Sequence, residues 1–295
     1  MRQLATIADL RAACDDARAR GERVGLVPTM GFLHEGHRSL IRAARAATDF
    51  VVVTIFVNPL QFGPTEDLEA YPRDLERDLA ACAAEGADAV FTPSVAEMYP
   101  RGAVTTVHVD GLTADLCGAS RPTHFDGVTT VVTKLFSIVG PCDAYFGRKD
   151  AQQLAVVRRM ALDLNLPAAV HGCPLVREAD GLALSSRNAY LTADEHAAAP
   201  VLFRALRAAA DAVAAGEREP EQLRAIVQST VATEPLVALE YIEVRDAHDL
   251  SRVDTLDGDV LVALAARLGR TRLIDNVQLT VSGDDVAADL GEVKQ

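Results

Sequence analysis

Three short apolar runs, rich in β-branched residues, alternate with segments of helical periodicity in the first third of this chain. The runs cover Val24–Val27, Phe50–Val57 and Ala89–Thr92, and helical patterns lie between them at Ser39–Ala47 and Asp67–Glu85. Strands that are apolar throughout are buried on both faces, and their alternation with helices is typical of a parallel sheet. We therefore predict that the chain begins with an α/β domain.

The alternation continues to about residue 170 and then changes. The further elements predicted for the first domain are a strand at Val104–Val109, a helix at Gly127–Val139, a strand at Asp143–Phe146, a helix at Ala151–Leu164 and a strand at Ala168–Val170. After a polar loop at Val176–Asn188 we predict helices at Ala193–Ala215 and Glu219–Thr233, then strands at Glu240–Val244, Val260–Leu264 and Thr271–Asn276. The sequence thus predicts an α/β domain at 1–175 and a smaller α+β domain at 176–295, with a loose polar tail after Ser282.

The bulk composition excludes several classes of partner. A net charge of −13 at pH 7 argues against a nucleic-acid-binding surface and points to a small anionic ligand in a local basic pocket. No apolar stretch is long enough to span a membrane, and Asp9 and Arg11 interrupt any signal-peptide core. The 5 cysteines lack C-x-x-C spacing. We expect reduced thiols in a cytoplasmic protein with no membrane and no nucleic-acid partner.

His34-Glu35-Gly36-His37 follows the first apolar run across a Pro/Gly turn and opens a helical run to Ala47. Residues three apart share one helix face, so both imidazoles point the same way. The N–H groups at a helix N-terminus suit a phosphate, and Gly36 leaves room for close approach. A pair of capping or surface histidines is the plain alternative. A zinc site is a weaker one, because metal-binding helices usually space the pair at i, i+4 and add a third ligand.

Two further segments carry groups that suit phosphates, and the chain has neither a Walker loop nor a G-x-G-x-x-G fingerprint. Gly147–Asp150 directly follows a predicted strand, where ligands bind in open parallel sheets. Ser185–Arg187 combines two hydroxyls with a guanidinium, a set that grips outer phosphates. An exposed charged cap and an ordinary Ser-rich turn are the respective alternatives.

Neutral amides and carboxylates complete the candidate set. Asn58 and Gln61 follow the strongest strand, and Gln152-Gln153 lies one helical turn past Lys149; such amides suit a hydroxy acid. Asp74 and Asp78 share a helix face, and either is able to hold Mg²⁺ directly or through water. A solvated helix face is the alternative for at least one of them.

Six segments, in order, resemble the pantoate–β-alanine ligase (pantothenate synthetase) family of the HIGH-motif nucleotidyltransferase superfamily. They are Pro28–His37, Phe56–Phe62, Tyr71–Asp74, Arg121–Phe125, Phe146–Gln153 and Val176–Asn188. The resemblance implies a cytoplasmic homodimer in which 1–175 is a Rossmann-like ATP- and pantoate-binding domain and 176–295 is a lid-like domain. It also implies an AMP-forming ligation of (R)-pantoate to β-alanine through pantoyl adenylate, with ATP and Mg²⁺ and with release of pyrophosphate, in the pathway to pantothenate and coenzyme A.

The resemblance also implies a role for each matching residue. His34, His37 and Lys149 are the implied catalytic residues at the α-phosphate, with His37 the proton donor. The implied ATP-binding residues are Met30, Gly31, Phe32, Leu33, His34, Glu35, Gly36, His37, Gly147, Arg148, Lys149, Asp150, Val176, Leu184, Ser185, Ser186 and Arg187. Gln61, Gln153, Asn58 and Met30 are implied to bind substrate, and Asp78 the metal. Arg148, Ala151, Leu184 and Cys117 stand where the family usually has Glu, Tyr, Met and Glu.

Three other functions fit parts of the pattern. A nucleotidyltransferase that adenylates a phosphomonoester needs extra basic residues, whereas this chain places amides there. A fragment or paralogue of a tRNA synthetase needs a basic RNA-reading surface, which the net charge opposes. A silent nucleotide sensor has no reason to keep both histidines, Lys149 and the Ser-Ser-Arg segment together.

Overall fold

The structure is a computed structural model, and it describes residues 1–64, 66 and 68–294. The chain divides into two compact units, one of Met1–Arg148 with Gln152–Cys173 and the other of Lys149–Ala151 with Pro174–Gln295. The division therefore falls after Cys173, beside the boundary predicted after residue 175, and the short Lys149–Ala151 segment groups with the second unit.

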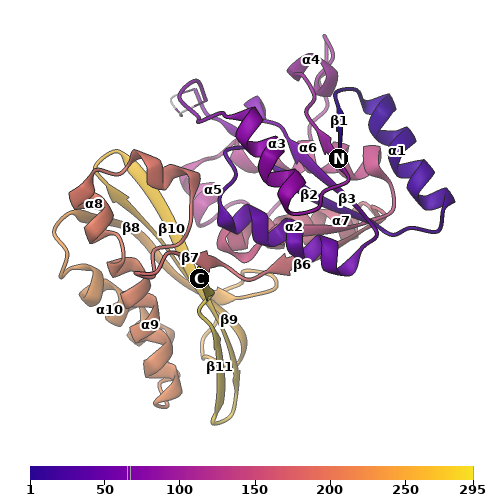
Figure 1. The fold of residues 1–295 in the computed structure, drawn as a ribbon. Coiled ribbons are helices and arrows are strands. Elements are labelled where there is room, and N and C mark those ends of the chain that lie inside the picture. The colour runs from indigo at the N-terminus through magenta and orange to yellow at the C-terminus, as the bar shows by residue number, and fades with distance from the viewer. Residues whose placement is uncertain (65, 67, 295) are drawn as a thin grey trace. The chain divides into compact units, whose positions relative to one another are not determined.

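The first unit is built on a six-stranded parallel sheet with the strand order β1-β4-β3-β2-β5-β6. Its strands are β1 Arg2–Leu4, β2 Val24–Thr29, β3 Phe50–Ile55, β4 Ala89–Phe91, β5 Cys142–Gly147 and β6 Ala168–Cys173. The central strands β2, β3 and β4 are buried almost throughout, as continuous apolar runs require. The predicted α/β class is confirmed (Figure 1).

Helices cover both faces of this sheet. They are α1 Ile7–Ala19, α2 Glu35–Ala47, α3 Leu75–Ala84, α4 Val95–Met98, α5 Cys117–Ser120, α6 His124–Val139 and α7 Ala151–Asp163, with the 3₁₀ turns η1 Pro59–Gln61 and η2 Arg148–Asp150. One core packs α1, α6 and α7 against one face of the sheet, and a second core packs α2 and α3 against the other. The result is the three-layer arrangement expected for βα units.

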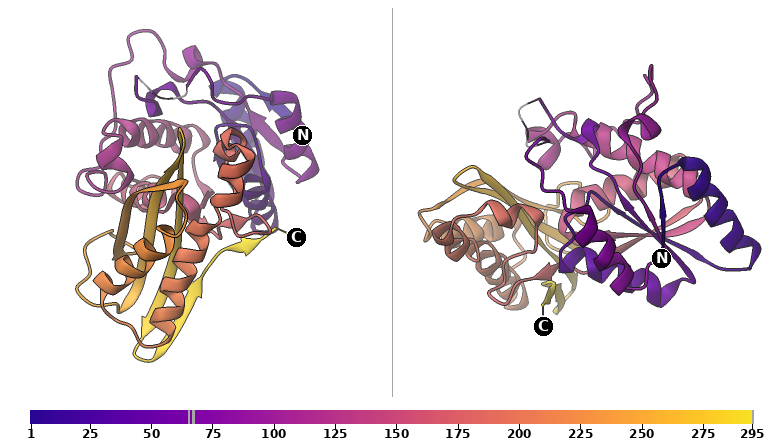
Figure 2. Two further views of the ribbon diagram at one scale, coloured as in Figure 1. Left: turned by 90° about the vertical axis from the view of Figure 1, so that its left-hand side faces the viewer. Right: turned by 45° about the horizontal axis from the view of Figure 1, so that its top comes forward.

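The second unit combines helices with an antiparallel sheet of order β11-β10-β9-β8. Its elements are β7 Val176–Arg177, η3 Ser186–Tyr190, α8 Ala193–Ala198, α9 Val201–Ala214, α10 Pro220–Val231, β8 Val237–Asp246, β9 Gly258–Leu268, β10 Thr271–Ser282, β11 Asp285–Asp289 and β12 Glu292–Val293. Figure 2 shows α9 and α10 lying along one face of this sheet, and their apolar sides form one core with it.

Two elements predicted from the sequence are wrong. Val104–Val109 is not a strand: the Val107 N–H donates to Thr130 Oγ1 and its carbonyl accepts from Thr129 Oγ1, so α6 satisfies the polar groups that a ladder would use. The predicted helix Ala193–Ala215 is two helices, because Pro200 lacks an N–H and cannot continue a helix.

The tail after Ser282 forms strands in its described part, contrary to the prediction. β11 pairs with β10, and β12 pairs with β7. In the first unit, α3 begins at Leu75, later than predicted; the predicted helix start at Asp67 lies outside the described residues. Among the helices that the structure describes, none has the length and apolar character needed to cross a membrane.

Candidate active site

The candidate residues of the first unit gather at one edge of its sheet. β2 ends at Thr29 and pairs in register with Ile55 at the end of β3, while β5 ends at Gly147. Because these strands are parallel, the loops that follow them leave from the same edge. The loop after β2 carries the histidine pair, and the loop after β3 carries Asn58 and Gln61.

The loop between β2 and α2 turns sharply just before the histidines. Gly31 has φ 85° and Phe32 has φ 50°, so two successive residues occupy the left-handed region. For Phe32 this conformation is strained and persists only where surrounding contacts hold it. Arg77 provides two such contacts: its guanidinium lies 5.0 Å from the Phe32 ring centroid and donates to the carbonyl of Leu33 at 3.2 Å.

Asp78 provides the main restraint on this turn. Its side chain is 1% exposed, and its two carboxylate oxygens accept from the backbone N–H groups of Phe32 and Leu33, each at 2.7 Å. A buried carboxylate is stable only with such partners. Asp78 therefore joins α3 to the loop that delivers His34.

His34 and His37 lie side by side at the start of α2. His34 is the N-cap residue, His37 is at the third helical position, and their ring centroids are 4.0 Å apart with a 42° interplanar angle. The backbone N–H of His34 donates to Nδ1 of His37 at 3.3 Å. Since an N–H only donates, Nδ1 accepts, and the neutral His37 ring then carries its proton on Nε2.

The glycine between the histidines has a packing reason. A Cβ at Gly36 would lie 3.0 Å from the His34 ring, so the imidazole would have to shift by a few tenths of an ångström. The histidine spacing and Gly36 are thus parts of one arrangement.

The residues present at Asp78 do not fit a directly bound magnesium ion. Each of its oxygens accepts a backbone N–H and the side chain is 1% exposed, whereas Mg²⁺ in nucleotide sites keeps several waters beside the carboxylates that bind it. We do not assign Asp78 as a metal ligand. Asp74, the alternative, is the exposed N-cap of α3, and its carboxylate accepts from Arg77 N.

Gln61 sits in η1, which the first turn of α6 holds closely. Its carbonyl accepts from Arg121 at 3.1 Å and from His124 Nδ1 at 2.9 Å. Arg121 is in turn held by both carboxylate oxygens of Glu66, at 2.6 and 2.7 Å. A Cβ at Gly127 would lie 2.3 Å from the carbonyl oxygen of Leu60, so only glycine allows this approach of η1 to α6.

The structure separates the two glutamines of α7. Gln152 is 7% exposed, and its amide accepts from Cys117 N and donates to the carbonyls of Leu112 and Asp115. It therefore holds the segment before α5, and both of its N–H donors are used within the protein. Gln153 is half-buried, and it is the one of the pair that a ligand is able to reach.

The predicted site residues fall in both units. Those in the first unit are Met30 to His37, Asn58, Gln61, Asp78, Gly147, Arg148 and Gln153; those in the second are Lys149, Asp150, Val176, Leu184, Ser185, Ser186 and Arg187. Lys149 is half-buried, and its backbone carbonyl accepts from Asn276 Nδ2 of β10 at 2.9 Å.

Arg148 also affects a neighbouring arginine of the first unit. Burial, and secondly the positive charge of Arg148, lower the pKa of the Arg158 guanidinium.

Arg177 anchors the start of the second-unit loop. Its side chain is fully buried, and its five N–H groups all donate hydrogen bonds. Two go to the carboxylate oxygens of Asp275, at 2.7 and 2.9 Å. The others go to the backbone carbonyls of Leu290, Gly181 and Asn276. Its guanidinium also lies 4.2 Å from the centroid of the Phe203 ring. Every donor of this arginine is satisfied, which burial of a charge requires.

The loop from Glu178 to Asn188 is fastened at several points. Ser185 caps η3 by accepting from Arg187 N at 3.2 Å, and Asn188 Nδ2 donates to Glu178 Oε1 and to Ala183 O, each at 3.1 Å. These hydrogen bonds hold the backbone of the segment that carries Ser185, Ser186 and Arg187.

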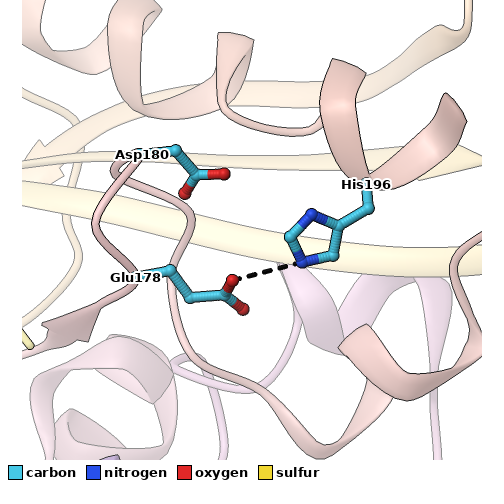
Figure 3. Close-up of side chains that lie close together, drawn as sticks. All are labelled: Glu178, Asp180 and His196. Atoms are coloured by element: carbon cyan, nitrogen blue, oxygen red, sulfur yellow. Dashed lines mark ion pairs between the residues drawn. The ribbon is translucent and has the colours of Figure 1, made fainter. Parts of the chain in front are cut away.

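Within the described residues, Glu178, Asp180 and His196 form the one group of His, Asp or Glu side chains close enough to share a metal ion (Figure 3). Glu178 faces His196 Nε2 at 3.2 Å and also holds Asn188, while Asp180 accepts from Leu182 N at 3.0 Å. Glu178, Asp180 and His196 therefore take part in the hydrogen bonds and the ion pair that hold the loop from Glu178 to Asn188.

Several residues that hold the site carry no signal in the local sequence pattern. Arg121, His124 and Glu66 act on Gln61 through contacts between distant parts of the chain. The carboxylate of Asp78 shares a helix face with Asp74, but its partners are backbone groups far away in the chain. No local pattern identifies contacts of this kind.

Comparison with known proteins agrees with this geometry. The family model described as pantoate-beta-alanine ligase matches residues 2–278. Pantothenate synthetase of Heliobacterium modesticaldum is 55% identical over 281 residues, 95% of this chain and 100% of that protein. Pantothenate synthetase of a Roseiflexus species is 57% identical over 279 residues, 95% and 99% of the two chains.

Solved structures show the same similarity. Pantothenate synthetase from Thermus thermophilus aligns with a TM-score of 0.89 at 47% identity, over 94% of this chain and 98% of that one. The pantoate-beta-alanine ligase from Francisella tularensis, complexed with beta-gamma ATP and beta-alanine, aligns with a TM-score of 0.76 at 33% identity, over 94% and 97%. With the family model matched over residues 2–278 and relatives more than 50% identical over 95% of its length, this chain belongs to the pantoate–β-alanine ligase family.

Proposed function

We propose that this chain catalyses the reaction of its family, the ATP-dependent ligation of pantoate to β-alanine, with the histidine pair acting at the α-phosphate. The observation that carries the proposal is the pair itself. Two imidazoles 4.0 Å apart at a helix N-terminus are held there by the Asp78 restraint on the preceding turn. Such preorganised donors stabilise charge that develops on a phosphate.

The proposed reaction has two steps. A carboxylate oxygen of pantoate attacks the α-phosphorus of ATP, and the bond to the β-phosphate oxygen breaks, so that pantoyl adenylate forms and pyrophosphate leaves. The amine of β-alanine then attacks the acyl carbon, AMP leaves, and the amine loses a proton. Activation is required because a free carboxylate has no good leaving group, whereas the mixed anhydride does.

The residues take distinct roles in this proposal. His37, with its proton on Nε2, donates to the α-phosphate, and His34 and Lys149 stabilise the same charge. Gln61 and Gln153 hold pantoate, with Met30 at its border, and Asn58 supports the Gln61 amide from within the protein. The other residues that the resemblance assigns to ATP keep that assignment, with Ser185, Ser186 and Arg187 on the outer phosphates. Mg²⁺ enters with the nucleotide, and no step here depends on a protein ligand to it.

Two finer properties belong to the same proposal. We expect a homodimer, as the family resemblance implies. We also expect a cytoplasmic protein, which is in keeping with five free thiols.

The test is AMP release from the whole chain with ATP, pantoate and β-alanine, omitting each in turn. AMP is expected only when all three are present, and pyrophosphate is expected with ATP and pantoate alone. Pyrophosphate release that needs a phosphomonoester in place of pantoate would establish the rival nucleotidyltransferase activity. Nucleotide binding with no turnover of any acid would establish a sensor.

A further inference from the structure

Asn58 lies at the centre of a hydrogen-bond relay that runs from Tyr99 to Gln61 within the first unit. The Tyr99 hydroxyl donates to Asn58 Oδ1 at 2.8 Å. The Asn58 amide group Nδ2 donates to Gln61 Oε1 at 2.9 Å. Asn58 is 1% exposed, so its amide depends on these protein partners.

Two backbone groups fix which way the Asn58 amide faces. The N–H of Leu60 donates to Oδ1 at 3.3 Å, and the carbonyl of Gly127 accepts from Nδ2 at 3.0 Å. A backbone N–H only donates and a carbonyl only accepts, so a flipped Asn58 amide would lose both bonds. The NH₂ group of Asn58 must therefore face Gln61, and the atom of Gln61 that meets it must be the oxygen.

This orientation determines what Gln61 offers to a ligand. Its oxygen is turned inward to Asn58, and its backbone carbonyl is held by Arg121 and His124. The remaining group, Nε2, has no hydrogen-bond partner among the residues that the structure describes, although the side chain is only 7% exposed. Gln61 thus presents a donor, which recognises an acceptor oxygen such as one on a carboxylate or hydroxyl.

Tyr99 is held as a donor by its surroundings. Its ring centroid lies 6.1 Å from that of Phe56, and Lys134 Nζ lies 5.9 Å from the ring centroid. Its backbone N–H closes α4 on the carbonyl of Val95 at 2.7 Å. Burial raises the pKa of the Tyr99 hydroxyl to about 12, so it keeps its proton at any ordinary assay pH.

We propose that Tyr99 is a positioning residue, which acts through Asn58 to hold the Gln61 amide with its NH₂ group toward pantoate. The inference rests on the proposed function, because pantoate is the ligand that Gln61 is assigned to hold. Without the Tyr99 hydroxyl, Asn58 Oδ1 keeps only the long bond from Leu60 N. The orientation of the Gln61 donor then loses part of its support.

The experiment compares Tyr99→Phe, Gln61→Ala and the double variant with the wild type, measuring KM for pantoate and for ATP separately. Tyr99→Phe is expected to raise the KM for pantoate about three- to tenfold, the effect of one neutral hydrogen bond, and to leave the KM for ATP unchanged. Tyr145→Phe is the control: it removes the hydroxyl of a buried tyrosine in the same unit and is expected to change neither value. In the Gln61→Ala background, Tyr99→Phe is expected to have no further effect.

A second variant, Asn58→Asp, tests the same orientation of the Gln61 amide without changing Tyr99. Asn58→Asp keeps an acceptor for Tyr99 and Leu60 but cannot donate to Gln61, so the Gln61 amide is expected to turn over and the KM for pantoate to rise further. An unchanged KM for pantoate in Tyr99→Phe, or an equal loss with and without Gln61, overturns the inference. A wild-type chain that releases no AMP overturns the proposed function instead.

Discussion

The carboxylate of Asp78 accepts a 2.7 Å hydrogen bond from the backbone N–H of Phe32, a residue held at φ 50°. The contact joins the start of one helix to the loop that leads into another, and the next N–H, that of Leu33, binds the second carboxylate oxygen. Directly after these residues the chain enters His34 and α2. The placement of the histidine pair thus depends on a carboxylate that never touches it.

Asp78→Asn is expected to lower kcat strongly, although the substitution hardly changes the size of the side chain. The amide replaces one acceptor with a donor that faces a backbone N–H, so a charge-assisted bond worth about 1.5–3 kcal/mol is lost. A displacement of the histidines by about 1 Å would cost about 100-fold in kcat. Asp74→Asn is the matched control on the same helix, because Asn caps a helix as well as Asp does. Equal kcat values for the two variants would contradict the role of Asp78.

His37→Ala is expected to reduce pyrophosphate release about 100- to 1000-fold, the usual cost of removing one preorganised donor to a developing charge. Lys149→Ala is expected to act in the same direction. Circular dichroism should stay unchanged, since both side chains are partly exposed. His171→Ala, which removes an exposed histidine on β6, serves as the control and should leave the rate unchanged. Near-normal turnover in both variants would refute the proposed chemistry.

Asp275→Asn is expected to lower the free energy of unfolding by about 3–5 kcal/mol, because it leaves the buried charge of Arg177 without its partner. Urea titrations of the wild type and of the variant measure this decrease in the unfolding free energy, which is expected in the second unit. Asp163→Asn, which breaks the exposed ion pair with Arg159, is the matched change and should cost no more than about 1 kcal/mol. Similar values for the two variants would show that the buried pair is not structural.

The ion pair between Glu66 and Arg121 predicts a dependence on pH. Burial works to raise the pKa of the Glu66 carboxyl, but the hydrogen bonds and charge of Arg121 outweigh it and leave this pKa below its ordinary value. A lowered carboxyl pKa gives stability that is present above the unfolded pKa, about 4.3, and is lost as the pH falls through the folded pKa. The difference in unfolding free energy between the wild type and Glu66→Gln should therefore be constant near neutral pH and shrink below about pH 4.

The matched control for that titration is Glu76→Gln, which changes an exposed carboxylate on α3. Its difference from the wild type should be small throughout. A Glu66→Gln difference that grows as the pH falls would give the wrong sign and reject the assignment.

The sequence alone determined the fold class and the edge of the sheet at which the candidate groups lie. Continuous apolar strands separated by helices require a parallel sheet, and loops after its strands must share one edge, so His34, His37, Asn58 and Gln61 were predictable from local pattern. Pro200 also carries a local signal for a helix break, yet the apolar face runs on past it and conceals the break.

Only the tertiary structure decided which of these groups are committed and which remain available. The helical spacing of Asp78 does not show that its oxygens accept from Phe32 and Leu33. Gln152 and Gln153 are equivalent in sequence, and only the structure shows that Gln152 is the one held beside α5. The Val104–Val109 run lacks a strand because α6 takes up the polar groups of Val107. In each case the deciding partner is distant in the chain, and a hydrogen bond between distant residues leaves no trace in local periodicity.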